Sequence, residues 1–247
     1  MSHIPVLRSG LCGVGGLDSS GRAPIEADAN DPSGYGYGIV SSFIKTATFV
    51  PATLQTNNIV TSAIVDGAAT LTAGTGVTST TLNGVAVLDI TGGAYDRAIR
   101  IIGTAGGVTA VSFTITGYDM YGQPVTQTIT GPAATATVTT TKTFRYISSI
   151  VSAATTTAAV TIGTADIYGF PARVDSFDQA LIFWNGALIT SNTGFTAAVS
   201  TTATASTGNV RGTYAVQSAS DGTKRLRTVV FLDNPNNMDN AYGVKQA

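Results

Sequence analysis

Apolar and hydroxyl-bearing positions alternate through the middle of the chain. In residues 108–116, Val111, Phe113 and Ile115 fall on one face and mostly hydroxyl side chains fall on the other. This period of two predicts a half-buried β-strand. Residues 125–130 alternate in the same way, and the glycine-bounded segment between the two runs predicts that they form a β-hairpin.

Further short strands are predicted on both sides of this hairpin, with a spacing of roughly 8–12 residues and no amphipathic helix. Asp66-Gly67 and Asp221-Gly222 predict two more hairpins, and Asn185-Gly186 predicts a tight turn. This spacing is typical of an all-β protein, so we expect an antiparallel, jelly-roll-like β-sandwich. The remaining predicted strands are residues 44–51, 63–72, 84–90, 97–102, 135–143, 144–151, 158–162, 179–185, 212–217 and 226–232.

The pattern divides the chain into three parts: an extended N-terminal arm (1–42), a sandwich body (43–232) and a C-terminal tail (233–247). The arm is rich in glycine and proline, which argues against regular structure. It nevertheless carries apolar side chains, so it is either a docking arm that contacts another chain or a floppy terminus. Its candidate contact residues are Ile4, Val6, Leu7, Leu11, Val14, Leu17, Tyr35 and Tyr37.

Charge is scarce in this chain: charged residues make up 11% of it, against roughly a quarter in ordinary proteins. Threonine is abundant instead, and its stiff β-branched side chain favours strands. A surface with so little charge is either covered by partners or coated with hydroxyl groups. The net charge of −1 provides no basic field, so we expect neither nucleic acid nor a membrane as a partner.

The chain has few groups that could support catalysis. His3 is the only histidine and Cys12 the only cysteine, which excludes a disulfide within the chain and leaves no set of ligands for zinc. A histidine so near the chain end is poorly placed for a catalytic triad. We therefore expect no enzymatic activity and no cofactor. The first residues lack the features of a signal peptide, and no apolar run is long enough to span a membrane, so assembly in a cytoplasm is expected.

Two weaker possibilities come from acidic and aromatic residues. Asp166, Asp175 and Asp178 are candidates for a hydrolytic pair of carboxylates, and either Asp119 or the Asp166/Asp175 region could bind calcium. Asp in β proteins, however, mostly bonds to the local backbone in turns. Tyrosines in glycine-rich segments could form a sugar platform, a subunit contact or ordinary loop packing. These are Tyr35, Tyr37, Tyr95, Tyr118 and Tyr121.

Residues 111–151 resemble a recurring segment of tailed-phage virion proteins. The segment reads as a strand, a Gly-Tyr-Asp hairpin, a threonine-rich strand and an aromatic-led Ile/Val strand. Residues 209–213 and 221–223 are similar to the C-terminal part of such proteins. The resemblance implies a virion structural protein that decorates or cements the capsid. It implies the major capsid protein as partner, a homotrimer, and no catalytic residues.

Two rival interpretations remain open. A tail or head-fibre protein would bind a host-surface glycan through its tyrosine- and threonine-rich loops. An extracellular hydrolase on a β-sandwich would require a catalytic base that the sequence does not place.

Overall fold

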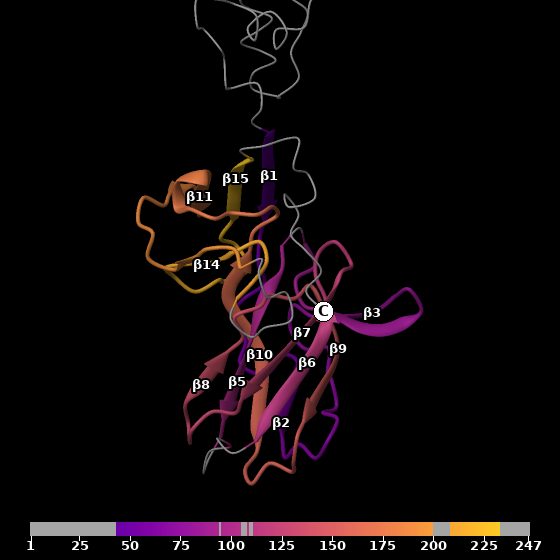
Figure 1. The fold of residues 1–247 in the computed structure, drawn as a ribbon. Helices are drawn as coiled ribbons and strands as arrows, with labels where there is room; N and C mark the ends of the chain where they lie inside the picture. Colours follow the sequence, from indigo (N-terminus) through magenta and orange to yellow (C-terminus); the bar gives the residue numbers. More distant parts are fainter. Residues whose placement is uncertain (1–42, 94, 105–107, 109–110, 200–207, 233–247) are drawn as a thin grey trace, which may run out of the picture.

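The computed structural model describes residues 43–93, 95–104, 108, 111–199 and 208–232 (Figure 1). Within these ranges the chain is built of antiparallel β-strands, and its only helical element is the short 3-10 helix η2 (Phe177–Gln179). The expected fold class, an antiparallel all-β sandwich of jelly-roll-like kind, is confirmed. The predicted arm and tail lie outside the described residues. So do all the arm's candidate contact residues: Ile4, Val6, Leu7, Leu11, Val14, Leu17, Tyr35 and Tyr37.

One sheet of the sandwich has five strands in the order β3-β4-β9-β6-β7. The predicted central hairpin is confirmed, with a register that runs from Ser112 opposite Thr130 to Tyr118 opposite Pro124. Apolar side chains of β6 point inward, and the threonines between them point outward. The five strands are β3 (Thr78–Leu82), β4 (Val85–Asp89), β9 (Tyr146–Ser152), β6 (Ser112–Tyr118) and β7 (Pro124–Thr130).

The second sheet has the order β13-β14-β10-β5-β8, and β2 also pairs with β10. Its longest strand, β10, pairs with β2 in its first half, with β5 both there and again at Tyr168, and with β14 at its end. The strands are β13 (Phe195–Thr196), β14 (Thr213–Ala215), β10 (Val160–Gly169), β5 (Arg97–Gly103), β8 (Thr137–Thr139) and β2 (Val60–Ala63).

These two sheets enclose the first hydrophobic core. It is formed by the inward-facing Ile, Val, Leu and Phe side chains of both sheets, because alternate residues of each strand face the same side. Members that are fully buried include Ile99, Ile101, Phe113, Ile115, Val125, Phe144, Ile147, Ile150, Val160 and Ile162.

A third sheet, in the order β1-β15-β11-β12, covers a second hydrophobic core at the upper end of the part that the structure describes (Figure 1). Its strands are β1 (Phe43–Phe49), β15 (Leu226–Leu232), β11 (Ala180–Trp184) and β12 (Ala187–Leu188). One strand spans both cores, because β10 places its first residue, Val160, in the first core and Tyr168, near its end, in the second. Aromatic residues dominate the second core: Phe49, Tyr95, Tyr168, Phe170, Trp184 and Tyr214.

Two predicted hairpins are wrong. Asp66-Gly67 does not join paired strands: β2 ends before it and pairs with β10, and Ala68 forms a bridge with Val151. Asp221-Gly222 separates β14 from β15, but these strands belong to different sheets. In both places the turn residues are real, yet the segments next to the turn pair with residues distant in sequence: β2 and β14 with β10, Ala68 with Val151, and β15 with β1.

One hairpin was not predicted from the sequence pattern. Strands β3 and β4 pair from Thr78 opposite Asp89 to Leu82 opposite Val85. Asn83 and Gly84 connect them, both with positive φ angles (50° and 82°), as a type I′ turn requires. This hairpin reaches outward from the side of the body (Figure 1).

Candidate functional site

An irregularity in β10 creates a polar junction between the two cores. Thr164 of β10 pairs with Ile99 of β5, and Tyr168 pairs with Arg97, so the register shifts between the two points. Such a bulge re-aims side chains that regular pairing would place elsewhere. Here it puts Asp166 beside Arg97.

Arg97 is the centre of the first buried network. Its side chain is 1% exposed, and its Nη2 lies 2.6 Å from Asp166 Oδ1. Its Nε donates to the Ala165 carbonyl oxygen (2.9 Å), its Nη1 to that of Ala52 (3.2 Å), and its Nη2 also to the Ser220 hydroxyl (2.9 Å). The guanidinium therefore has protein partners on every side, as a buried cation requires.

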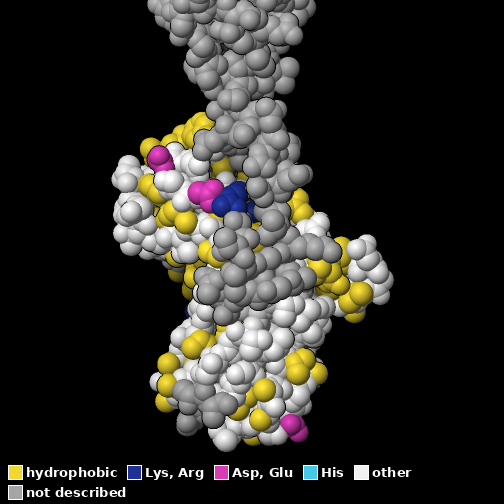
Figure 2. Space-filling view, in the orientation of Figure 1, with side chains coloured by type: hydrophobic (Ala, Val, Ile, Leu, Met, Phe, Trp, Pro, Cys, Tyr) yellow, Lys and Arg dark blue, Asp and Glu magenta, His cyan; other side chains and the backbone are white. Residues whose placement is uncertain are grey.

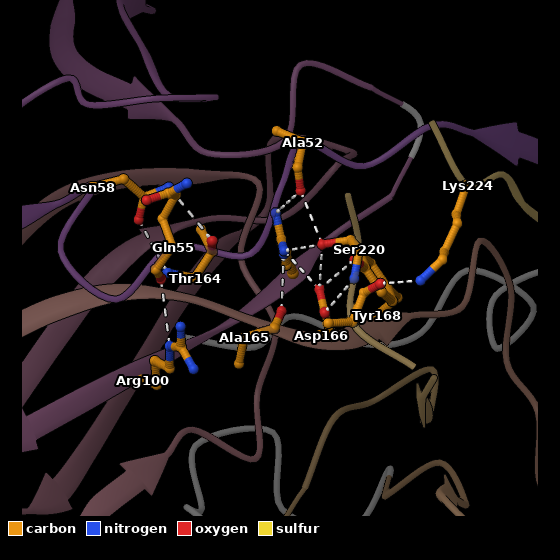
Figure 3. A network of polar contacts seen from close by, with 12 residues as sticks. Ala52, Gln55, Asn58, Arg100, Thr164, Ala165, Asp166, Tyr168, Ser220 and Lys224 are labelled. Carbon is orange, nitrogen blue, oxygen red and sulfur yellow. Dashed lines mark hydrogen bonds and ion pairs between the residues drawn. The ribbon is translucent and has the colours of Figure 1, made fainter. Parts of the chain in front are cut away.

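Asp166 is held as firmly as its arginine partner. Its Oδ1 accepts a hydrogen bond from the Tyr168 hydroxyl (2.8 Å), and its Oδ2 accepts one from the Ser220 amide (2.8 Å). The Ser220 hydroxyl lies 2.9 Å from the Ala52 carbonyl oxygen and 2.8 Å from Asp166 Oδ1, either of which can take its proton. Figure 3 shows these groups converging from separate segments. The network thus ties together the chain after β1, strand β10 and the chain before β15.

Arg211 is the centre of a second network, and it is completely buried. Its Nη1 lies 2.7 Å from Asp119 Oδ2, its Nη2 pairs with Asp96, and its Nε donates to the Phe170 carbonyl oxygen (3.0 Å). The ring of Tyr121 lies against the guanidinium, with 5.1 Å from its centroid to Cζ. One cation therefore links the tip of the β6–β7 hairpin to the end of β10 and to the chain before β14.

Burial sets the protonation of this triad. It raises the pKa of Asp96 to about 7 from 3.8, because the loss of hydration outweighs the attraction of Arg211. Burial alone would lower the pKa of Arg211, but the carboxylates of Asp96 and Asp119 raise it above its ordinary value. The guanidinium therefore stays charged, and Asp96 is the member of the triad whose charge changes near neutral pH.

The acidic residues considered for hydrolysis or calcium binding have other partners. Asp119 also accepts hydrogen bonds from the Tyr121 and Gln123 amides (both 2.9 Å), which is turn chemistry. Asp175 pairs with Arg173 on the surface (2.7 Å), and Asp178 contacts the Ser176 hydroxyl. In the part of the chain that the structure describes, no three His, Cys, Asp or Glu side chains gather as a metal site would need.

The described loop tyrosines mainly serve packing. Tyr95 is buried in the second core, where its hydroxyl lies 2.6 Å from Thr228 Oγ1 and donates to the Ala47 carbonyl oxygen (3.0 Å). Tyr118 lies on β6 rather than in a loop. Tyr121 is 38% exposed, but its hydroxyl donates to the Pro171 carbonyl oxygen and its ring covers Arg211. Of these three, Tyr121 alone presents much surface to a ligand.

The two arginine networks were not predicted from the sequence. Arg97 begins the run RAIRII, and Arg211 stands between Val210 and Gly212. The available signal was weak: each arginine adjoins apolar residues in a chain with little charge, and an arginine that becomes buried needs a buried partner. The identity of those partners was not available, because they lie 69 to 115 residues away.

No protein-family model, no curated protein and no solved structure matches this chain. In the described ranges, no helix is long and apolar enough to cross a membrane. Both networks join segments from the two cores through several internal hydrogen bonds and ion pairs, although Asp96 Oδ1 is buried without a hydrogen-bond partner.

Proposed function

We propose that this protein is a non-enzymatic structural subunit of a phage virion, which binds the capsid and stabilises it as a decoration protein. The observation that carries the proposal is the distribution of charge. Several of the few charged side chains are buried, either in the polar junction between the two cores or in the core beside it. The buried ones are Asp96, Arg97, Asp119, Lys142 and Arg211.

The surface left behind is largely hydroxyl-bearing. On the outer face of the β6–β7 hairpin, threonines replace charges, and Thr114 and Thr128 share a hydrogen bond of 3.0 Å. Figure 2 shows few charged side chains on the viewed face, most of them in its upper part. An isolated soluble protein keeps more surface charge for solubility. A hydroxyl-rich, weakly charged surface suits a subunit that is permanently packed against neighbouring subunits.

The clamped junction supports the same proposal. A protein that reinforces a shell must transmit load between its contacts without deforming. Here two cores are joined by two buried guanidinium groups, each bonded to several chain segments. The body therefore has the internal bracing that a reinforcing element needs.

Stabilisation would follow from mass action. A ligand that binds only the assembled lattice lowers the free energy of that lattice, and many modest contacts on one particle act together. We expect the protein to contact the major capsid protein and further copies of itself, as a trimer. Sedimentation of the purified protein tests the trimer.

Locating the protein in virions tests the role. We expect many copies distributed over the capsid in electron microscopy, and a copy number that matches the symmetry of the shell. Capsids stripped of the protein should rupture at lower temperature and regain resistance when it is added back. A handful of copies at the tail tip would overturn the proposal, and binding of the purified protein to host cells would then favour the fibre alternative.

A further inference from the structure

Strand β3 is an exposed edge of the five-stranded sheet. It stands at the end of the order β3-β4-β9-β6-β7, and its only strand partner among the described residues is β4. Thr78, Ser79, Thr80 and Thr81 are all exposed. The hairpin stands away from the body (Figure 1), so neighbouring molecules can approach this edge.

This edge lacks the protection that monomeric proteins give to theirs. Exposed edges are normally blunted by lysine, proline, an inward charge or a bulge, because their free backbone groups invite pairing. Residues 77–88 contain no charged residue and no proline. The β3–β4 pairing shows no register shift. An unprotected edge of this kind is suited to pairing with another strand.

The turn determines which backbone groups are available. In a hairpin with a two-residue type I′ loop, the residues flanking the loop form a hydrogen-bonded pair. Here these residues are Leu82 and Val85 on either side of Asn83-Gly84.

The direction of the backbone groups then alternates along β3. Thr78 and Thr80, like Leu82, direct their N–H and C=O groups toward β4. Ser79 and Thr81 direct theirs outward. The free edge thus offers two donors and two acceptors, centred on Thr80.

We propose that β3 pairs with β3 of a second copy, antiparallel and about a twofold axis that passes beside Thr80. In this register Ser79 of each copy faces Thr81 of the other, and the outward groups of both residues are satisfied. The edge is thus complementary to itself. A charge near a twofold axis would face its own copy, and residues 77–88 carry none.

The pairing rests on the geometry of the hairpin and not on the proposed capsid role. It joins two five-stranded sheets into one continuous sheet across two molecules. The contact is isologous, so it closes on itself and does not propagate into a fibre. Between oligomers on a shell, such hairpins would link neighbours at twofold positions.

Cysteine cross-linking tests the register. Thr80 would face Thr80 of the second copy as a non-hydrogen-bonded pair with Cα atoms about 4.5 Å apart, within the range of about 4.4–6.8 Å for a disulfide. We expect Thr80→Cys, in a Cys12→Ser background, to form a disulfide-linked dimer. Oxidised glutathione is the oxidant: two thiols become one disulfide and one glutathione disulfide becomes two glutathione molecules.

Ser79→Cys in the same background is the matched control. It is equally exposed, but its Cα atoms would lie roughly 8–9 Å apart, beyond the limit of about 7 Å. It should cross-link poorly alone, yet form heterodimers with Thr81→Cys, whose Cα would lie about 5.5 Å away. Trp184 fluorescence verifies that each variant is folded.

Each cross-linking result either supports or overturns the proposed pairing of β3. Efficient dimers of Thr80→Cys, poor dimers of Ser79→Cys and heterodimers of the mixture support the pairing. Equal cross-linking of both single variants would indicate random collision and overturn it. Failure of folded Thr80→Cys to cross-link would also overturn it, and a strand of another protein would then become the candidate occupant.

Discussion

At the scale of single residues, burial decides what the charged side chains of this protein do. Asp221 lies in an exposed turn, where the Thr223 and Lys224 amides lower its pKa to about 2. Asp96 is buried against Arg211, and burial raises its pKa to about 7. The two aspartates thus titrate in different pH ranges. The turn gives the Asp221 carboxylate hydrogen bonds and water, whereas burial removes water from the Asp96 carboxylate.

The raised pKa of Asp96 predicts an unusual dependence of stability on pH. In the unfolded chain Asp96 titrates near 3.8. Between that value and about 7 the folded state therefore holds a proton that the unfolded state has lost. The free energy of unfolding should rise as pH falls from 8 to 5, and it is measured by urea denaturation at constant ionic strength.

Two variants identify the group responsible. Asp96→Asn should lose this rise. Asp221→Asn should keep it, because Asp221 titrates below the window. Its own contribution is present above the unfolded pKa and is lost as pH falls toward 2. A wild-type stability that stays flat or falls between pH 8 and 5 would contradict the expectation.

At the scale of elements, glycine has two distinct roles in the five-stranded sheet. Gly84 supplies the positive φ of the β3–β4 turn, and a Cβ there would meet nothing within 4 Å. Gly117 lies in β6 between β9 and β7, where a Cβ would clash with the Tyr146 carbonyl oxygen. Glycine is required at position 84 for its positive φ angle and at position 117 because there is no room for a side chain.

Alanine substitutions separate these roles. Gly84→Ala should cost about 1–2 kcal/mol of unfolding free energy, the strain of a left-handed residue. Gly117→Ala should cost about 3 kcal/mol or more, since two central strands must move apart. Chemical denaturation measures both values. Equal small losses would show that β6 and β9 can separate easily.

The sequence predicted elements better than it predicted their partners. Both strands of the β6–β7 hairpin were predicted correctly, because apolar and polar residues alternate along each strand and a local turn joins them. At Asp221-Gly222 the turn was equally visible, but β15 pairs with β1, which begins at Phe43. Local signals specify a turn, whereas the burial of apolar faces against distant strands decides which strands pair.

The candidate site was less predictable than the fold. Neither Arg97 nor Arg211 was predicted as a site residue, and the geometry that pairs Arg97 with Asp166 depends on a bulge in β10. Bulges leave no clear mark in an alternating pattern. The acidic residues were visible, and only the folded structure distinguishes Asp166 in the junction from Asp175 on the surface.

At the scale of the whole molecule, the junction should make two cores unfold as one. Trp184, the sole tryptophan, lies in the second core and reports on it by fluorescence. Far-UV circular dichroism reports on all the sheets. In the wild type both signals should change together, as expected of a two-state transition.

Arg97→Met should uncouple the cores. It removes hydrogen bonds to Ala52, Asp166 and Ser220. It also leaves a buried carboxylate without its cation, at a cost of about 3–5 kcal/mol. The fluorescence transition should then separate from the circular dichroism transition. Arg173→Met, which removes an exposed pair worth about 0–1 kcal/mol, should leave them coincident; coincident transitions in Arg97→Met would refute the coupling.

The pairing of β1 with β15 has a mechanical consequence. Phe43 lies opposite Leu232, so the two ends of the described body leave the same end of the same strand pair. Tension applied through both ends would open the bonds between these strands one after another, as a zipper opens, rather than shearing them all at once. The body is therefore weak when pulled by its ends and braced against loads that enter through its faces.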